Sequence, residues 1–167
     1  MNIYIVDDRP QTMLLAIKEI QDLGGCVHTV FSFSDNEDEN DTKKNRIIES
    51  KFHEIGVSLE PINSKNFAFA LDQVYKEPDT IFLFDFDLTP EESIHPDERI
   101  NVEYALSKYQ QDPANFKIWF YTTGTATFIS SISKMFGNRL IPIKKFDIHS
   151  HQLSLDLTVL KQTLRLC

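Results

Sequence analysis

The chain contains short apolar runs that each end abruptly in polar residues. They are residues 3–6, 81–84, 118–121 and, in a weaker form, 140–143. Continuous apolar runs, in contrast to alternating ones, are typical of strands that are covered on both faces of a sheet. The pattern therefore predicts a set of buried parallel strands.

Amphipathic helices are predicted between these strands, because apolar residues recur there at intervals of three or four positions. The helical periodicity covers residues 13–20, 67–75, 102–109 and 128–136, and a last helix runs from Leu153 to the C-terminus. Alternating strands and helices imply a parallel sheet with helices on both faces. We therefore predict an α/β fold with a doubly wound parallel sheet of five strands.

The segment from residue 26 to 54 predicts an extra strand–helix unit inserted into this sheet. Strands are expected at residues 26–33 and 57–62, with a helix at about 43–54 between them. The acidic run at residues 34–41 predicts a solvated loop. Together these features indicate a single domain over residues 1–167, with an acidic insertion at about residues 34–56.

Composition and charge argue against a nucleic-acid-binding, membrane-spanning or secreted protein. A chain of 167 residues with 41% hydrophobic content is long enough to bury a sizeable core. Its formal net charge of −8 argues against broad contact with nucleic acid or with an anionic membrane. No apolar run approaches the roughly 20 residues of a membrane-spanning helix, and the N-terminus lacks the features of a signal peptide. Cys26 and Cys167 lie far apart, which favours reduced thiols, so we expect a cytoplasmic protein.

The polar residues that end the predicted strands should converge, because open parallel sheets bind ligands at the carboxyl ends of their strands. They comprise three carboxylates, a hydroxyl and an ammonium, from Asp7, Asp8, Asp85, Thr122 and Lys144. Clustered carboxylates repel one another unless a cation lies among them, and hard oxygen ligands suit Mg²⁺. The hydroxyl and the ammonium could bind phosphoryl oxygens, and an Asp beside the metal could accept a phosphoryl group. The pattern predicts phosphoryl chemistry.

Four segments, in this order, resemble the motifs of the receiver domains of two-component response regulators, which have a flavodoxin-like fold. Residues 3–8 resemble the first strand with its acidic pair, and residues 85–89 resemble the phosphoacceptor segment. Residues 118–123 are similar to the fourth strand with its hydroxyl, and residues 143–147 to the fifth-strand segment that carries the lysine. The resemblance spans nearly the whole chain.

The resemblance implies roles for individual residues. Asp85 would be the phosphoacceptor, assisted by Thr122 and Lys144. Mg²⁺ would be held by Asp7, Asp8, Asp85 and Asp87. Asp87 could instead hold the water that hydrolyses the acyl phosphate.

Two of these assignments stay open between neighbouring residues. The spacing favours Thr122 over Thr123 for the phosphate-binding hydroxyl. The strand phase favours Lys144, directly after Ile143, over Lys145 for the ammonium. The resemblance alone does not decide between the members of either pair.

The resemblance also implies partner proteins. A histidine kinase or a phosphotransfer protein would supply the phosphoryl group, and a downstream protein target would dock to the phosphorylated domain. Because the chain ends with the last predicted helix, we expect a stand-alone receiver without a DNA-binding output domain. Whether the domain forms a homodimer stays open.

The sequence also departs from the receiver pattern. The separation between Asp8 and Asp85 is longer than usual by about one strand–helix unit, which the predicted insertion could supply. Thr89 stands where the phosphoacceptor segment usually has proline, proline is also missing after Lys144, and Ile141 stands where the family usually has an aromatic switch residue. These departures affect the expected conformational switch more than the metal site.

Two other functions fit part of the pattern. Asp85 and Asp87 also resemble the Asp-x-Asp-x-Thr nucleophile motif of haloacid-dehalogenase-type phosphatases, in which the second Asp acts as acid and base. That family places its nucleophile strand first, so this alternative ranks second. A degenerate receiver that binds partners without being phosphorylated is the third alternative.

Overall fold

The computed structural model describes residues 1–35, 42–88, 99–122, 126–137, 140, 142–149 and 152–164. Several predictions concern residues outside these ranges, namely the acidic loop from residue 36, Thr89, Thr123, Ile141 and Cys167. Cys26 is an exposed free cysteine. None of the helices within the described ranges is both long enough and apolar enough to cross a membrane.

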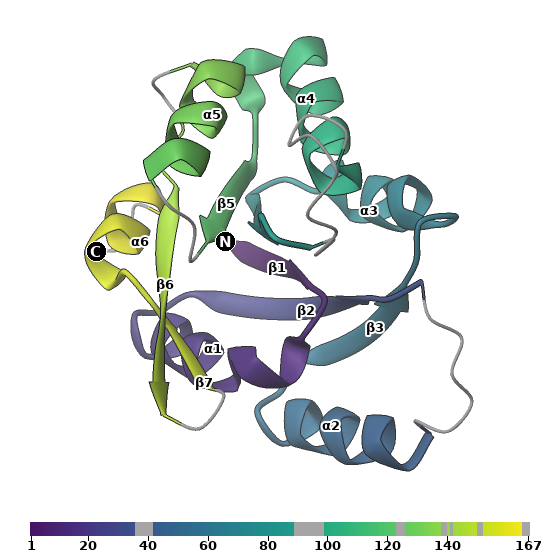
Figure 1. Ribbon diagram of the computed structural model, residues 1–167. Coiled ribbons are helices and arrows are strands. Elements are labelled where there is room, and N and C mark those ends of the chain that lie inside the picture. The colour runs from purple at the N-terminus through teal and green to yellow at the C-terminus, as the bar shows by residue number, and fades with distance from the viewer. Residues whose placement is uncertain are drawn as a thin grey trace.

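The described residues form a seven-stranded sheet and six α-helices (Figure 1). The strands are β1 (Asn2–Asp7), β2 (Cys26–Phe33), β3 (Ser58–Ile62), β4 (Thr80–Asp85), β5 (Ile118–Thr122), β6 (Ile143–His149) and β7 (Gln152–Leu155). The helices are α1 (Leu14–Asp22), α2 (Thr42–Glu54), α3 (Phe67–Tyr75), α4 (Ile100–Gln111), α5 (Ala126–Phe136) and α6 (Leu157–Leu164). Two short 3₁₀ helices, η1 (Pro10–Met13) and η4 (Pro113–Asn115), precede α1 and β5.

The strand order is β3-β2-β1-β4-β5-β6-β7, and all neighbouring pairs are parallel except β6 with β7. The predicted α/β class with a mostly parallel sheet is therefore confirmed. The two strands and the helix expected between residues 26 and 62 are also present, as β2, α2 and β3. β1 and β4 form the centre of the sheet.

Apolar side chains pack on both faces of the sheet because successive residues of a strand point to opposite faces. One cluster joins Tyr4, Val6, Phe82, Phe84 and Phe120 to apolar residues of α3, α4 and α5. The other joins Ile3, Ile5, Ile81, Leu83 and Tyr121 to α1, α2 and α6. Figure 1 shows these two sets of helices on opposite sides of the central strands. β1, β4 and β5 are therefore largely buried on both faces, as their continuous apolar runs predict.

The C-terminal region differs from the prediction. Leu153 was expected in the last helix, because it continues the spacing of Leu157, Leu160 and Leu164, but it lies in β7. Leu153 and Leu155 are both buried, and because they lie two residues apart in a strand they point to the same face of the sheet. The side chain of Asp156 accepts hydrogen bonds from the backbone N–H groups of Thr158 and Val159, so α6 begins after it.

The strand predicted at residues 140–143 is also displaced. β6 begins only at Ile143 and continues to His149. Pro142 directly precedes the strand, where a residue without a backbone N–H does not interrupt the ladder. Both lysines therefore lie within the strand, where their side chains point to opposite faces.

Candidate functional site

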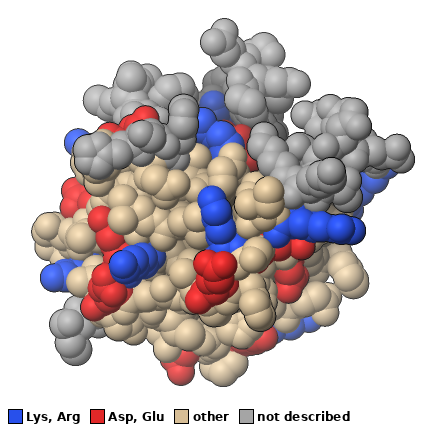
Figure 2. Space-filling model, turned by 90° about the horizontal axis from the view of Figure 1, so that it is seen from below, with Lys and Arg blue, Asp and Glu red and all other residues tan. Residues whose placement is uncertain are grey.

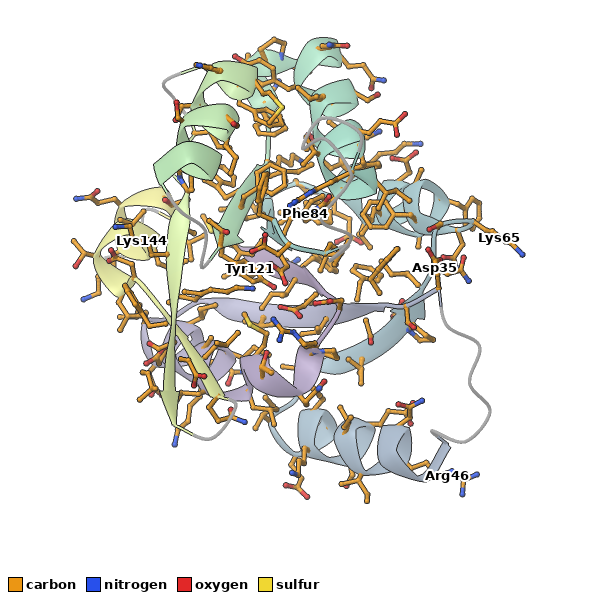
Figure 3. The ribbon with its side chains drawn as sticks, in the orientation of Figure 1. Asp35, Arg46, Lys65, Phe84, Tyr121 and Lys144 are labelled. Carbon is orange, nitrogen blue, oxygen red and sulfur yellow. The ribbon has the colours of Figure 1, made fainter. Side chains whose placement is uncertain are left out.

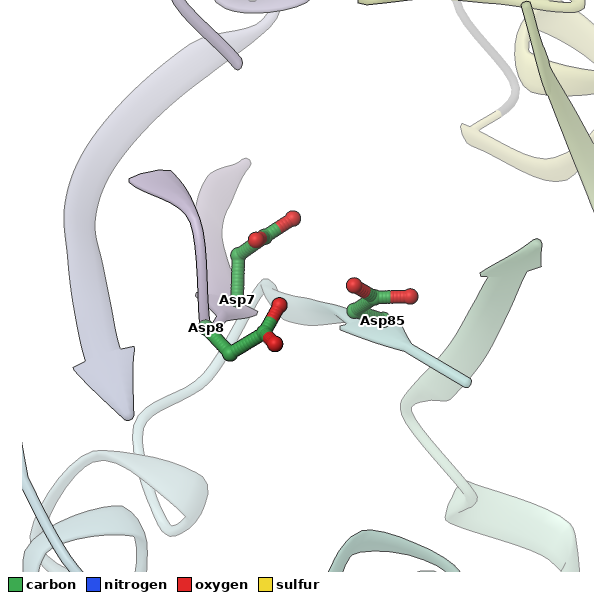
Figure 4. Close-up of side chains that lie close together, drawn as sticks. All are labelled: Asp7, Asp8 and Asp85. Carbon is green, nitrogen blue, oxygen red and sulfur yellow. The ribbon is translucent and has the colours of Figure 1, made fainter. Parts of the chain in front are cut away.

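Three carboxylates meet at the carboxyl ends of the two central strands (Figure 4). Asp7 ends β1, Asp8 follows it, and Asp85 ends the neighbouring strand β4. The two strands are parallel and pair Val6 with Phe84, so Asp7 and Asp85 occupy equivalent positions one residue further on. One oxygen of each of the three carboxylates lies within 4.8 Å of the others. The predicted convergence of these three residues is present in the structure.

Burial of these carboxylates in their charged form is energetically unfavourable unless a cation offsets their charge. Asp7 and Asp85 are each 1% exposed, and the side chain of Asp8 is 20% exposed. Desolvation, reinforced by the charge of Asp85, raises the pKa of Asp8 to about 6. Desolvation and the charge of Asp7 raise the pKa of Asp85 to about 6, against the lowering effect of Lys145. Desolvation likewise raises the pKa of Asp7.

Two oxygens of the cluster are buried and accept no hydrogen bond from the described residues. They are Oδ1 of Asp8, which lies 3.8 Å from Arg9 Nε, and Oδ2 of Asp85. A buried carboxylate oxygen without a partner is unfavourable, and a divalent cation would satisfy several such oxygens at once. The donor set, three carboxylates at one strand edge, fits Mg²⁺.

The site contains a buried ammonium, but it belongs to Lys145. Its Nζ lies 2.9 Å from Oδ1 of Asp85, and both side chains are 1% exposed. Lys144, which the sequence favoured, is exposed on β6, so the structure places Lys145 and not Lys144 beside Asp85 (Figure 3). Alternation along the strands gives the reason. Lys145 shares its face of the sheet with Ile143, whose core cluster also contains Ile5 and Leu83, and these lie two residues before Asp7 and Asp85 on the same face of their strands.

Tyr121 contributes to the site and was missed by the sequence analysis. It is fully buried on β5, and its hydroxyl donates to Oδ2 of Asp7 at 2.6 Å. Burial and the charge of Asp7 raise the pKa of Tyr121 well above its ordinary value, so the hydroxyl remains a donor. The sheet pairs Tyr121 with Asp85. A search of the neighbouring strand for a polar side chain opposite Asp85 would therefore have found Tyr121.

Thr122 and Asp87 interact with each other beside the cluster. Thr122 is 1% exposed, and its Oγ1 donates to Oδ2 of Asp87 at 3.0 Å. Arg99 Nη1 lies 3.5 Å from Oδ1 of the same carboxylate. Asp87 was predicted as a fourth metal ligand, but within the described part of the chain the cluster contains only Asp7, Asp8 and Asp85.

The start of α4 holds the loop that follows Asp85. The side-chain amide of Asn101, which is fully buried, donates to the carbonyl oxygen of Asp85 at 2.6 Å. Arg99 Nη1 donates to the carbonyl oxygen of Phe86 at 3.0 Å, and its guanidinium carbon lies 4.8 Å from the centre of the Phe86 ring. These contacts hold the backbone at Asp85 and Phe86, directly after the end of β4. Neither Arg99 nor Asn101 belongs to a periodic pattern by which the sequence analysis could have found it.

A groove of about 530 Å³ adjoins the cluster on the side of Asp8. It runs past η1 and the ends of β2 and β3 to the first half of α2, and its walls include Ser32, Asn45 and Asn63. The segment from β2 to β3 therefore supplies one wall of a groove that reaches the acidic cluster.

The complete site thus combines three carboxylates, a buried ammonium and two hydroxyls, contributed by the ends of β1, β4 and β5 and by β6. Comparisons with protein-family models, with curated proteins and with solved structures found no match to this chain. The function is therefore inferred from the geometry of the site.

Proposed function

We propose that this chain is a receiver-like signalling domain that accepts a phosphoryl group on Asp85 with the help of Mg²⁺. The main support is the carboxylate of Asp85. Its Oδ1 is held by the ammonium of Lys145, while its buried Oδ2 accepts no hydrogen bond from the described residues and belongs to a cluster of three carboxylates. A carboxylate that is fixed by one oxygen and available through the other suits a phosphoryl acceptor.

The strand order supports a doubly wound, flavodoxin-like core. Strands β2-β1-β4-β5-β6 follow the receiver order 2-1-3-4-5, with β3 added beyond β2 and β7 beyond β6. In that arrangement the site lies at the central switch in strand order, here between β1 and β4. The six parallel strands also follow the order of dinucleotide-binding folds, but Asp7-Asp8-Arg9-Pro10 replaces their glycine-rich turn after the first strand.

The proposed reaction is an in-line phosphoryl transfer. A carboxylate oxygen of Asp85 attacks the phosphorus, and the bond from phosphorus to the donor breaks as the donor leaves with the electron pair. Asp7, Asp8 and Asp85 would hold Mg²⁺, which offsets the charge of the phosphoryl oxygens. Lys145 would bind one phosphoryl oxygen. Thr122 would exchange its bond to Asp87 for another.

A domain that accepts a phosphoryl group needs a donor protein and a target protein. A histidine kinase or a phosphotransfer protein would donate the phosphoryl group in the cytoplasm, and a protein target would recognise the phosphorylated domain. On the face seen in Figure 2, basic and acidic side chains are interspersed among the described residues. Such a surface, together with a net charge of −8, favours protein partners over nucleic acid.

A phosphatase remains the second candidate, because Asp87 lies two residues after Asp85 as its motif requires. The contacts of Asp87 with Thr122 and Arg99 give it a structural role at the loop. The third candidate, a degenerate receiver, would not need a complete acidic cluster.

Phosphorylation of Asp85 is the prediction that tests this function. Incubation with acetyl phosphate and Mg²⁺ should add one phosphoryl group to the intact protein, as measured by mass spectrometry. Asp85→Asn should abolish the adduct, because the nucleophilic carboxylate is removed. Asp147→Asn is a matched control, because Asp147 is an exposed carboxylate on β6 outside the cluster, and it should be phosphorylated like the wild type.

Two other results would contradict the proposal. Repeated turnover of a simple phosphomonoester, lost in Asp87→Asn, would identify a phosphatase. A folded protein that gives neither adduct nor turnover would identify an interaction module.

A further inference from the structure

The hydroxyl of Tyr121 lies at the centre of a buried hydrogen-bond arrangement around Asp7. It donates to Oδ2 of Asp7 at 2.6 Å, and it also lies 3.3 Å from the carbonyl oxygen of Val6. The Tyr121 side chain is fully buried, so water does not compete for these contacts. The hydroxyl therefore holds one oxygen of Asp7 in a defined place.

The other oxygen of Asp7 is also held. The backbone N–H of Arg9 donates to Oδ1 of Asp7 at 2.6 Å. Each carboxylate oxygen has two lone pairs, so each oxygen that accepts one hydrogen bond keeps a lone pair for a metal. Two donors on opposite oxygens fix the plane of the carboxylate without using up its capacity to ligate.

The ring of Tyr121 has a second contact within the site. Lys145 Nζ lies 5.4 Å from the centre of the ring, while the same ammonium pairs with Asp85. This distance permits a cation–π interaction. Tyr121 thus contacts Asp7 through its hydroxyl, and through its ring it contacts Lys145, the partner of Asp85. The two contacts can be separated by substitution, because phenylalanine keeps the ring and removes only the hydroxyl.

We propose that Tyr121 is a positioning residue for the divalent-cation site, and that its hydroxyl sets the affinity for Mg²⁺ by orienting Asp7. This inference rests on the proposed function, because it assumes that Asp7 ligates the cation. Groups that hydrogen-bond to a metal ligand fix the orientation of that ligand, and their removal weakens metal binding by about 10–100-fold.

The test is a calorimetric titration with Mg²⁺ of the wild type and of Tyr121→Phe. We expect the dissociation constant to rise by at least about tenfold in Tyr121→Phe. Tyr104→Phe is the matched control, because the Tyr104 hydroxyl is also mostly buried and donates to a carboxylate, Oδ1 of Asp72, outside the cluster. Its dissociation constant should equal that of the wild type.

A double-mutant cycle separates positioning from a general loss of packing. If Tyr121 acts through Asp7, then Tyr121→Phe should not weaken Mg²⁺ binding any further in an Asp7→Asn background. Additive effects in the cycle would overturn the inference. A Tyr121→Phe protein that binds Mg²⁺ with the dissociation constant of the wild type would also overturn the inference. That result would not affect the assignment of the three carboxylates to the metal site. Absence of Mg²⁺ binding in the wild type would refute the metal site itself, and the inference with it.

Discussion

Replacement of Lys145 with methionine is expected to destabilise the metal-free protein by about 3–5 kcal/mol at neutral pH. Lys145 is the buried partner of Asp85, and both side chains are 1% exposed. Without it, Asp85 keeps a buried negative charge beside Asp7 and Asp8. Removal of one member of a buried ion pair leaves an uncompensated charge, which costs more than the pair contributes. The free energy of unfolding, from urea denaturation in the presence of a chelator, measures the loss.

Lys144→Met provides the matched control for this substitution. Lys144 has the same side chain on the same strand, but it is exposed, so its replacement should change the free energy of unfolding by less than about 0.5 kcal/mol. Equal effects of the two substitutions, or a larger effect at Lys144, would contradict the assignment of Lys145 to the site.

Asp8→Asn is expected to stabilise the metal-free protein, by an amount that grows with pH. The pKa of Asp8 is raised to about 6 in the folded state, from an ordinary value of 3.8. Between these values the folded state binds the proton that the unfolded state has lost, so the contribution of Asp8 to stability falls as pH rises. The contribution of Asp8 to the free energy of unfolding is fully present below about pH 4 and is lost progressively up to about pH 6. Above that pH it changes no further.

The advantage of Asp8→Asn over the wild type should therefore rise from near zero at pH 4 to about 2 kcal/mol at pH 7.5. This figure is smaller than the full pKa shift implies, because part of the Asp8 side chain is screened by solvent. Urea denaturation at several pH values in the presence of a chelator measures the difference between the two proteins. A constant difference across this range would contradict the raised pKa. With Mg²⁺ present the order should reverse, since the ion binds the ionised carboxylate of the wild type.

The sequence predicted the ends of the central strands well. Asp7, Asp8 and Asp85 each follow a continuous apolar run, and such runs both identify buried strands and locate their carboxyl ends. The strands β2 and β3 and the helix α2 between them were also predicted, and they lie close to the expected ranges.

The contribution of β6 could not be predicted in the same way. Its apolar pattern is short, and the choice between Lys144 and Lys145 depends on which face of the sheet each residue points to. That face is set by the register of β6 against β5, which pairs Ile143 with Tyr121 and Lys144 with Thr122. A shift of one residue moves a side chain to the opposite face.

Tyr121 was not predicted for a different reason. It is the last residue of an apolar run, so the sequence pattern assigns it to the core. Its ring does pack in the core, but its hydroxyl binds Asp7. Arg99 and Asn101 lie before the apolar periodicity of α4, and their contacts with the loop after Asp85 arise only when that helix packs beside β4. Contacts between distant segments of this kind leave no periodic signal in the sequence.

We propose that Asp7, Asp8 and Asp85 hold a divalent cation beside a phosphoryl acceptor. A crystal structure with Mn²⁺ and beryllofluoride, a stable mimic of the phosphoryl group, tests both parts in one map. We predict an anomalous Mn²⁺ peak within coordinating distance of the three carboxylates, and beryllofluoride bonded to a carboxylate oxygen of Asp85 and in contact with Lys145. A map in which the cluster holds no Mn²⁺, or in which beryllofluoride is bonded elsewhere, would contradict the account.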